Sequence, residues 1–499
     1  MTKQELKRLV NRLERESAAA PEVYRLKVVL LASLGYAYIF LLAALALIGL
    51  GWALWQLAHG EFFAALRVGL LSGLISLMLV PTLWVRIPQP HGHRLQPLDA
   101  PKLFAIIEKV RAKSRGPKID QIVINDVFNT AIVQIPRLGI LGWHRNILII
   151  GLPLLQALSR KEFAAILAHE FAHLSSRHGK LGTWIYRIRT VWMQVLASFG
   201  PDASIVGRLL TRPLRGYIPY FNAYSSVLAR QDEYEADRLA ALVVGPRTLA
   251  DALIAIAIRG RFINDGFWHD LWRRAETCPE PPFLPHSSMR TALNLGIPPD
   301  QAEHWLNEAL QHDTASGDTH PCLRDRIQAL DTSCEIPPNA THSAAQMLLG
   351  EMLTTLQHTF DDLWLQYNGP RWRERFHTVS TARETLVRME NHAQQNLGPE
   401  ELGHYALALE TLGRTDEALP LLRQAADHPH GQAAAALAAA RILHARDDEA
   451  TIRYLELAMH RDRSLSEEVT TQAAAFYEAR GDTDKAGAYW QRLANLQLN

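Results

Sequence analysis

The chain has 499 residues, a formal net charge of +1 at pH 7 and 48% hydrophobic residues. This length corresponds to two or three folded domains. The balanced charge gives no sign of a nucleic-acid partner, because binding of nucleic acid depends on strongly basic surfaces. The cysteines Cys278, Cys322 and Cys334 form neither a C-x-x-C pair nor a disulfide framework, which fits a reducing compartment.

Two long apolar runs dominate the N-terminal part of the chain. Residues 28–57 contain no charged side chain, and the run exceeds the roughly 20 residues that cross a bilayer. Residues 62–85 form a second run, with Arg67 near its start, where the guanidinium can reach the membrane interface. The shorter length of the second run leaves a buried core helix as its alternative. Together the runs predict a transmembrane hairpin over residues 28–85.

Basic residues predict the orientation of this hairpin. They are frequent in segment 1–27 and again in residues 86–115, whereas the connector between the two runs offers essentially Arg67 alone. Positive flanks mark the cytoplasmic side of a membrane protein. We therefore predict a multi-pass protein of the inner (plasma) membrane, with a basic cytoplasmic N-terminal segment and with the lipid bilayer as a partner. Everything after residue 90 is expected in the cytoplasm.

A small mixed domain is expected after the hairpin. Residues 89–93 read as a linker, and apolar spacing over residues 101–115 predicts a helix. Residues 121–124 and 147–150 are rich in branched side chains and predict short strands. This part of the chain is therefore expected to form a small sheet beside helices.

The next helix carries an H-E-x-x-H motif, His169-Glu170-Phe171-Ala172-His173, inside the apolar run 161–173. Two histidines four residues apart share one helical face, so both imidazoles can reach one metal ion. The glutamate beside the first histidine can hold a water molecule against that metal. The motif predicts one Zn2+ per chain, with His169 and His173 as ligands and Glu170 as the catalytic base. The alternative is a surface helix that happens to carry two histidines.

A third ligand is expected downstream, since a catalytic zinc site has three protein ligands and one open position. Residues 229–242 read as a helix in which Glu233 and Asp237 are four residues apart and face the same way. We predict Glu233 as the third ligand. Asp237 would lie behind it and accept the free N–H of a zinc-bound histidine. An ordinary acidic helix face is the alternative, and the nearby H-E-x-x-H motif favours the metal site.

These paired motifs resemble the HtpX-type and CaaX-prenyl-type family of membrane-associated zinc metallopeptidases. The resemblance covers about residues 95–335, with weaker matches at residues 125–131, 148–155 and 319–327. It implies a zincin-like metalloprotease domain over residues 90–335. The chain departs from HtpX-type members between the two motifs, where they are expected to carry further membrane spans. Here residues 184–196 form one short stripe, interrupted by arginines, that predicts an amphipathic helix covering the core or lying on the membrane.

Three further residues gain candidate roles from the resemblance. His320 is expected near the zinc, where it can orient substrate, stabilise an oxyanion or occupy the open metal position. Its alternative is a turn histidine before Pro321. Arg326 either contributes positive charge to the site or pairs with Asp325 or Asp237. Asn129 begins a segment that can act as the edge strand along which substrate binds, or it merely caps a turn. The proline-rich residues 276–300 read as an irregular excursion or surface loop.

The composition changes after about residue 340, where alanine and leucine dominate. Turn-like elements at residues 413–418, 446–450 and 481–486 recur near the roughly 34-residue period of tetratricopeptide repeats. We predict a C-terminal helical-repeat domain over residues 340–499 that resembles degenerate tetratricopeptide repeats, with a plain helical bundle as the alternative. Stacked helix pairs of this kind hold peptides or partner proteins.

The combined expectation is a predominantly helical α+β protein with a membrane hairpin, a metalloprotease domain and a repeat domain. The resemblance implies a zinc-dependent endopeptidase (EC 3.4.24 type) that cleaves membrane or misfolded proteins in protein quality control. Its partners would be protein or peptide substrates. The alternative is a membrane-tethered chaperone or assembly scaffold, which binds client or adaptor proteins through the repeats and has latent protease activity.

Overall fold

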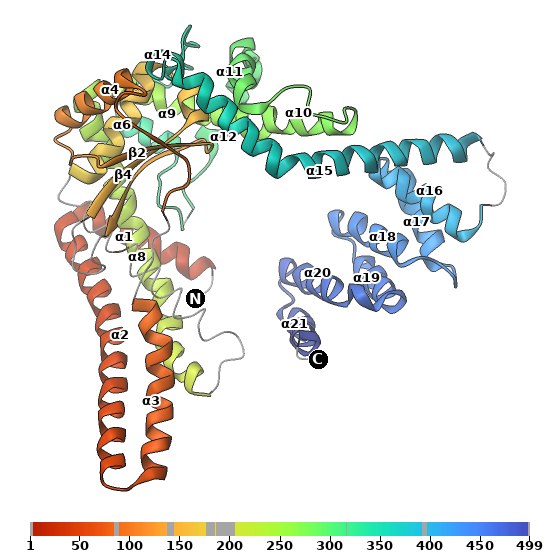
Figure 1. Cartoon of the computed structure of the whole chain (residues 1–499), viewed down its shortest axis with the longest axis horizontal. Helices are drawn as coiled ribbons and strands as arrows, with labels where there is room; N and C mark the ends of the chain where they lie inside the picture. Colours follow the sequence, from red (N-terminus) through yellow and green to blue (C-terminus); the bar gives the residue numbers. More distant parts are fainter. Residues whose placement is uncertain are drawn as a thin grey trace. The chain divides into compact units, whose positions relative to one another are not determined.

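The computed structural model describes residues 3–83, 89–136, 144–175, 185, 205–315, 317–391 and 397–497. The chain divides into two compact units. Unit 1 comprises Met1–Trp268 and Leu284–Asp362, and unit 2 comprises His269–Phe283 and Leu363–Asn499. Figure 1 labels the helices and strands of both units.

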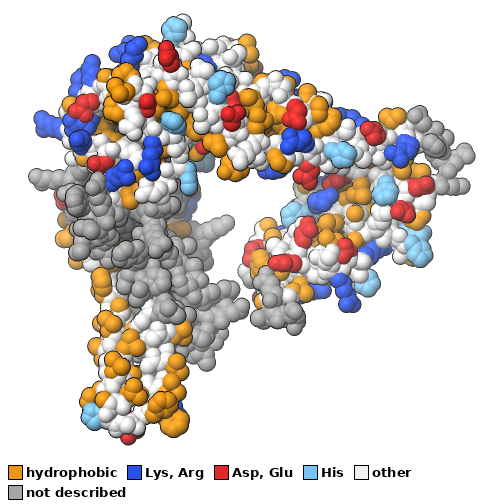
Figure 2. Space-filling view, in the orientation of Figure 1, with side chains coloured by type: hydrophobic (Ala, Val, Ile, Leu, Met, Phe, Trp, Pro, Cys, Tyr) orange, Lys and Arg blue, Asp and Glu red, His pale blue; other side chains and the backbone are white. Residues whose placement is uncertain are grey.

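Three helices form the N-terminal part of unit 1. They are α1 (Lys3–Ala19), α2 (Pro21–Ala58) and α3 (Phe62–Leu83). Helices α2 and α3 pack side by side as a helical hairpin (Figure 1). Leucine, isoleucine and tryptophan side chains of α2 point outward and are exposed, so the visible face of the hairpin is largely apolar (Figure 2). Within the described residues, α2 alone is long and apolar enough to cross a membrane.

A four-stranded sheet lies beside the helices of unit 1. Its strands are β1 (His93–Leu95), β2 (Gln121–Asn125), β3 (Thr130–Pro136) and β4 (His144–Gly151), in the order β1-β2-β4-β3. The β2–β4 pair is parallel, while β1 and β3 pair antiparallel with their neighbours. The central strands are rich in buried isoleucine, leucine and valine, as expected where helices cover a sheet. Strand β3 occupies one edge.

The helices that carry or support the site surround this sheet. They are α4 (Pro101–Lys113), α5 (Leu152–Ala157), α6 (Arg160–Ser175), α8 (Ile205–Val244) and α9 (Pro246–Arg261). Helix α6 is buried along most of its length, and it packs against α4, α8 and α9. A buried ion pair joins Glu162 of α6 to Arg259 of α9 with an N–O distance of 3.0 Å. The core thus holds α6 rigidly, which any site built on it requires.

Further helical segments complete unit 1. They are η2 (Phe262–Phe267), α11 (Pro285–Leu295), α12 (Pro299–Gln311), α13 (Leu323–Ala329), α14 (Ala344–Leu348) and the first part of α15 (Met352–Asn391). The expectation that residues 276–300 are irregular was therefore wrong over α11. Pro285 and Pro299 begin helices because proline fits the first helical turn, where its missing N–H costs nothing.

Unit 2 is built from successive helix pairs. Its elements after α15 are α16 (Pro399–Thr411), α17 (Thr415–Asp427), α18 (Ala433–Ala445), α19 (Ala450–Arg461), η4 (Arg463–Leu465), α20 (Ser466–Ala479) and α21 (Thr483–Gln497). Helices α10 (Trp268–Arg273) and η3 (Arg274–Glu276) begin the inserted segment. Gly413, Asp447 and Gly481 have positive φ angles at the turn inside each pair, a common way to end a helix. The turn elements expected from the sequence thus lie where helices end.

The expected amphipathic helix over residues 184–196 lies outside the described residues, except for Ile185. That side chain is 7% exposed and packs in a cluster with α1, α2 and α8.

The buried carboxylate of Asp361 holds the first turn of α11 in place. Asp361 accepts hydrogen bonds from the backbone N–H groups of His286 (2.7 Å) and Ser287 (3.1 Å), and it is fully buried. The substitution Asp361→Ala leaves these donors without partners and should destabilise the protein by about 2–3 kcal/mol. Thermal unfolding followed by circular dichroism should show a lower midpoint, whereas Asp362→Ala, at the exposed neighbour, should leave it unchanged. An equal midpoint for both variants would contradict this assignment.

Candidate metal centre

The predicted ligands come from two packed helices of unit 1. His169 and His173 lie one turn apart on α6, and Glu233 lies on α8. His169 and Glu233 are buried, with exposed fractions of 6% and 5%. A buried carboxylate beside two imidazoles requires a compensating partner, because an isolated charge is costly in a protein interior.

The three side chains converge on one point. The Nε2 atoms of His169 and His173 are 3.0 Å apart, and Glu233 Oε1 lies 3.2 Å from His173 Nε2. Glu233 Oε2 lies 3.6 Å from His169 Nε2. All three residues offer ligand atoms within 4.8 Å of one another. Tetrahedral zinc with bonds of about 2.0–2.1 Å would separate its ligand atoms by roughly 3.3 Å, so the donors present fit a zinc ion.

A second layer of contacts orients the histidine pair. His169 Nδ1 lies 2.9 Å from Asp237 Oδ1, on the side of the ring opposite to Glu233. Arg326 of α13 donates two hydrogen bonds to the same carboxylate, at 2.8 and 2.7 Å. Of the alternatives for Arg326, the structure thus shows the pair with Asp237. A proton held at Nδ1 leaves Nε2 free to bind a metal.

Charged neighbours in the site shift the pKa values of its carboxyl groups. Burial acts to raise the pKa of the Glu233 carboxyl, but contacts with His173 and His320 outweigh it and hold the pKa well below its ordinary value. Burial likewise opposes ionisation of Asp237, and the hydrogen bonds from Arg326 overcome it and lower the pKa. Both carboxylates are therefore negative at neutral pH, as metal and histidine partners require.

Glu170 differs from these two carboxylates. Burial raises the pKa of its carboxyl above the ordinary value, although the charges of His169 and His173 act against the rise. A carboxyl with a raised pKa exchanges protons more readily near neutral pH than a surface glutamate does. Glu170 is thus a buried carboxyl with a raised pKa beside the two histidines on the same helix.

His320 lies at the open side of the site. Its Nδ1 is 3.0 Å from Glu233 Oε2, while its side chain is 68% exposed. Contact with Glu233 raises the pKa of the His320 imidazole. Arg326 Nη1 lies 3.7 Å from the same oxygen. Both cationic groups predicted from the weaker late segment therefore lie at the candidate centre, and His320 is reachable from solvent.

Asn129 lies in a turn just before β3. Its side-chain Oδ1 accepts a hydrogen bond from the Thr130 N–H (2.8 Å), and its carbonyl accepts one from the Gly151 N–H (2.8 Å). These contacts support the turn-capping alternative for the side chain. A Cβ at Gly151 would lie 1.7 Å from the Val127 carbonyl oxygen, so this close approach of strand ends requires glycine.

The sequence did not indicate how α2 contacts α8. Arg25 Nη2 lies 3.5 Å from Asp232 Oδ1 and 3.8 Å from Glu235 Oε2. Tyr24 donates a hydrogen bond to the Tyr224 carbonyl at 2.8 Å. The first turn of α2 therefore covers the side of α8 that carries Asp232 and Glu235. The signal in the sequence was Arg25, a basic residue just before the apolar run, which needs an acidic partner.

Comparison with known families agrees with this geometry. Residues 140–333 match the model of peptidase family M48. This match confirms the resemblance to a family of metallopeptidases noted from the motifs. M48 metallopeptidases depend on zinc, in agreement with the cluster of His169, His173 and Glu233.

No curated protein matches the chain. Among solved structures, the crystal structure of S. mikatae Ste24p aligns over 64% of this chain and 67% of that chain, with 16% identity and a TM-score of 0.28.

The contact behind His169 yields a second prediction. Asp237→Asn removes the negative charge beside Nδ1 of His169 and leaves Arg326 with the more distant Glu233 carboxylate as its ion-pair partner. Zinc affinity, measured by competition with a chromophoric chelator, should fall by about 10–100-fold. Glu235→Gln is the matched control, since this residue on the same helix contacts Arg25 instead. Unchanged affinity in a folded Asp237→Asn protein would show that Asp237 does not support the ligand.

Proposed function

We propose that this protein is a membrane-anchored zinc endopeptidase that cleaves membrane or misfolded proteins. The observation that carries the proposal is the convergence of His169, His173 and Glu233 beside Glu170, in a domain of peptidase family M48. One zinc ion per chain, held by those three ligands, would act as a Lewis acid toward the scissile carbonyl and the attacking water.

Side chains around the ligands would carry out the remaining steps of the reaction. Glu170 accepts a proton from the attacking water and passes it to the leaving amine, a role for which its raised pKa is suited. Asp237 and Arg326 keep His169 in the required tautomer. His320, exposed at the edge of the site, is the side chain best placed to donate a hydrogen bond to the developing oxyanion.

Strand β3 offers a place for the substrate backbone. It is an edge strand, paired on one side with β4, and it packs beside α6. An extended peptide can add to such an edge through main-chain hydrogen bonds, which bind without regard to sequence. Substrate would then lie along Thr130–Pro136 with its scissile bond near α6. This arrangement suits an enzyme that accepts many unfolded segments.

The membrane anchor is proposed from α2 and α3. Helix α2 meets the length and hydropathy of a span, and α3 packs along it as a second apolar helix. The basic residues on both outer sides of the hairpin favour a cytoplasmic location for the catalytic and repeat regions of an inner-membrane protein. Substrates would then be cut at the cytoplasmic face. A processing role on prenylated CaaX proteins is disfavoured, because it would need a many-span chamber.

The helix pairs of unit 2 favour a second candidate function. The recurrent positive-φ turns at Gly413, Asp447 and Gly481 suit tetratricopeptide-like repeats, which bind client or adaptor proteins. In that case the protein would act mainly as a membrane-tethered chaperone or assembly scaffold, and proteolysis would be latent. The two functions differ in their dependence on Glu170.

The variant Glu170→Gln tests the enzyme directly. It removes the proton acceptor but keeps the side chain's size, so cleavage of casein or a membrane-protein substrate should fall by about 100- to 10,000-fold. Zinc content should stay at that of the wild type, since Glu170 is not a proposed ligand. Cleavage by the wild type should also stop after chelation and return with added zinc.

Two outcomes would contradict the enzyme proposal. If Glu170→Gln cleaves as fast as the wild type, Glu170 is not the base. If neither protein cleaves while both hold zinc and both bind unfolded clients, the scaffold function is the better account.

A further inference from the structure

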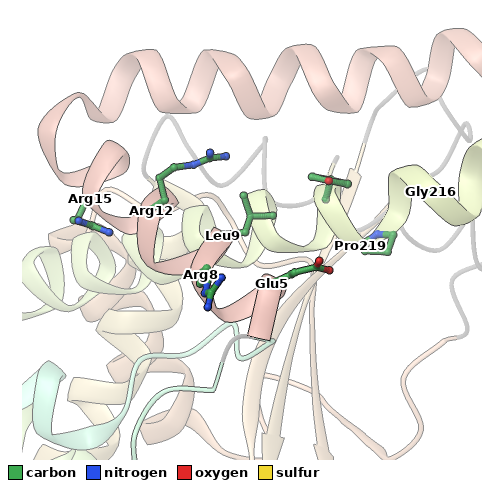
Figure 3. Close-up of a pocket in the computed structure, with 8 residues that line it drawn as sticks. Glu5, Arg8, Leu9, Arg12, Arg15, Gly216 and Pro219 are labelled. Atoms are coloured by element: carbon green, nitrogen blue, oxygen red, sulfur yellow. The ribbon is translucent and has the colours of Figure 1, made fainter. Parts of the chain in front are cut away.

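A basic cavity lies between α1 and α8, and its lining includes none of the proposed zinc ligands. Its volume is about 830 Å3, within the roughly 300–1,000 Å3 of small-molecule sites. It is lined by Glu5, Arg8, Leu9, Arg12 and Arg15 of α1 and by Gly216, Pro219 and Tyr220 of α8 (Figure 3). Neither the zinc chemistry nor the peptidase family accounts for it.

The arginines of this cavity carry positive charge that the protein compensates only in part. Arg8, Arg12 and Arg15 follow one another at helical spacing, so they share a face of α1. Like charges one turn apart destabilise a helix. Among the described residues, Arg8 makes no ion pair, and Arg15 Nε donates to the Asn11 carbonyl at 3.2 Å. Among the described residues that line the cavity, Glu5 is the acidic one.

The ion pair of Arg12 is weak, because its partner Glu16 also pairs with Lys27. Its Nε lies 3.6 Å from Glu16 Oε1, and the Arg12 side chain is 62% exposed. The other oxygen of Glu16 lies 2.9 Å from Lys27 Nζ. One carboxylate therefore serves two cations, and an exposed pair of this kind contributes little. Arg8, Arg12 and Arg15 thus line one cavity, and their guanidinium donors suit an anion with several acceptor oxygens.

The rest of the lining is apolar and aromatic. Leu9 is buried at the cavity and packs in the cluster that joins α1, α2 and α8. Tyr220 is a large side chain that remains 52% exposed. An exposed tyrosine beside arginines is typical of the boundary between lipid headgroups and acyl chains. The cavity also lies close to the membrane along the chain, because α1 ends at Ala19 and the apolar helix α2 begins at Pro21.

We propose that this cavity binds the phosphate-bearing headgroup of an anionic membrane lipid. The inference rests on the proposed membrane anchoring of α2. Phosphate oxygens match the guanidinium donors, and a free phosphate shares that chemistry. Tyr220 and the adjacent start of α2 favour the lipid, since a free phosphate gains nothing from an aromatic neighbour. Basic clusters beside a membrane helix attract anionic headgroups by the same electrostatics.

Occupation of the cavity bears on the metal centre through α8. Gly216, Pro219 and Tyr220 belong to the same helix as Glu233. An anion held between α1 and this part of α8 would fasten the two helices together at the membrane surface. The headgroup site is therefore expected to hold the catalytic domain in a set orientation toward the bilayer.

The test is binding of a soluble short-chain lipid to the purified full chain in neutral detergent. The probe is dihexanoylphosphatidylglycerol, with dihexanoylphosphatidylcholine and inorganic phosphate as competitors, and calorimetry is the measurement. The triple variant Arg8→Gln/Arg12→Gln/Arg15→Gln should bind the anionic lipid about 100-fold more weakly. Triple substitution by lysine, which keeps the charge, should restore part of the affinity.

The control is a variant that loses the same charge elsewhere. Lys102→Gln/Lys109→Gln/Lys113→Gln changes three exposed lysines of α4 and should bind the lipid as the wild type does. Equal binding by both triple variants would overturn the site, because the attraction would then be diffuse. Inorganic phosphate that competes as strongly as the anionic lipid would overturn the assignment to a lipid.

Membrane anchoring is checked separately by flotation with phosphatidylcholine vesicles. A chain that floats but shows no arginine-dependent lipid binding refutes the headgroup site and leaves the anchored peptidase standing. A chain that fails to float refutes the anchoring itself.

Discussion

The candidate active site depends on a buried line of charge that runs from Arg326 through Asp237 to His169. Three elements distant in sequence, α13, α8 and α6, meet in it. The Arg326 guanidinium and the Asp237 carboxylate are tolerable in the interior because they pair with each other, and removing one member of such a buried pair costs about 3–5 kcal/mol. The line sets the orientation of the His169 ring, and it brings Glu233, one turn from Asp237, toward both histidines.

Helix α8 is the element that connects this centre to the N-terminal helices α1 and α2. Its C-terminal half carries Glu233 and Asp237, while α1 and α2 pack along it nearer its start. Arg25 at the base of α2 pairs with Asp232, the residue next to the ligand. The residues that would bind metal and those that would meet the lipid surface thus belong to one compact unit.

Much of the centre followed from spacing in the sequence. Residues four apart on a helix share a face, so the histidine pair and the pair of Glu233 and Asp237 could be inferred without coordinates. The helical hairpin and the strands near 121–124 and 147–150 followed from hydropathy and branched residues. In these cases the signal is local, because it lies within one element.

Tertiary contacts left no such signal. Arg326 had several acidic candidates, and only the packing of α13 on α8 selected Asp237. The contact of Arg25 with Glu235 had no local signal either, because the packing of α2 on α8 joins residues that are far apart in the chain. The helix α11 was missed because prolines were taken as breakers when they are helix starters. Gly151 is required by the close approach of the Val127 carbonyl, and Asp361 is buried against a helix far away in the sequence. Neither contact can be inferred from a short window of sequence.

The most direct test of the central claim is anomalous X-ray scattering at the zinc edge from crystals of the full chain. The account predicts one zinc peak per chain, bonded to Nε2 of His169, Nε2 of His173 and the carboxylate of Glu233. Asp237 should remain within hydrogen-bond distance of His169 Nδ1. A peak held by other residues, or crystals grown with zinc that show none at this point, would contradict the assignment of the metal centre.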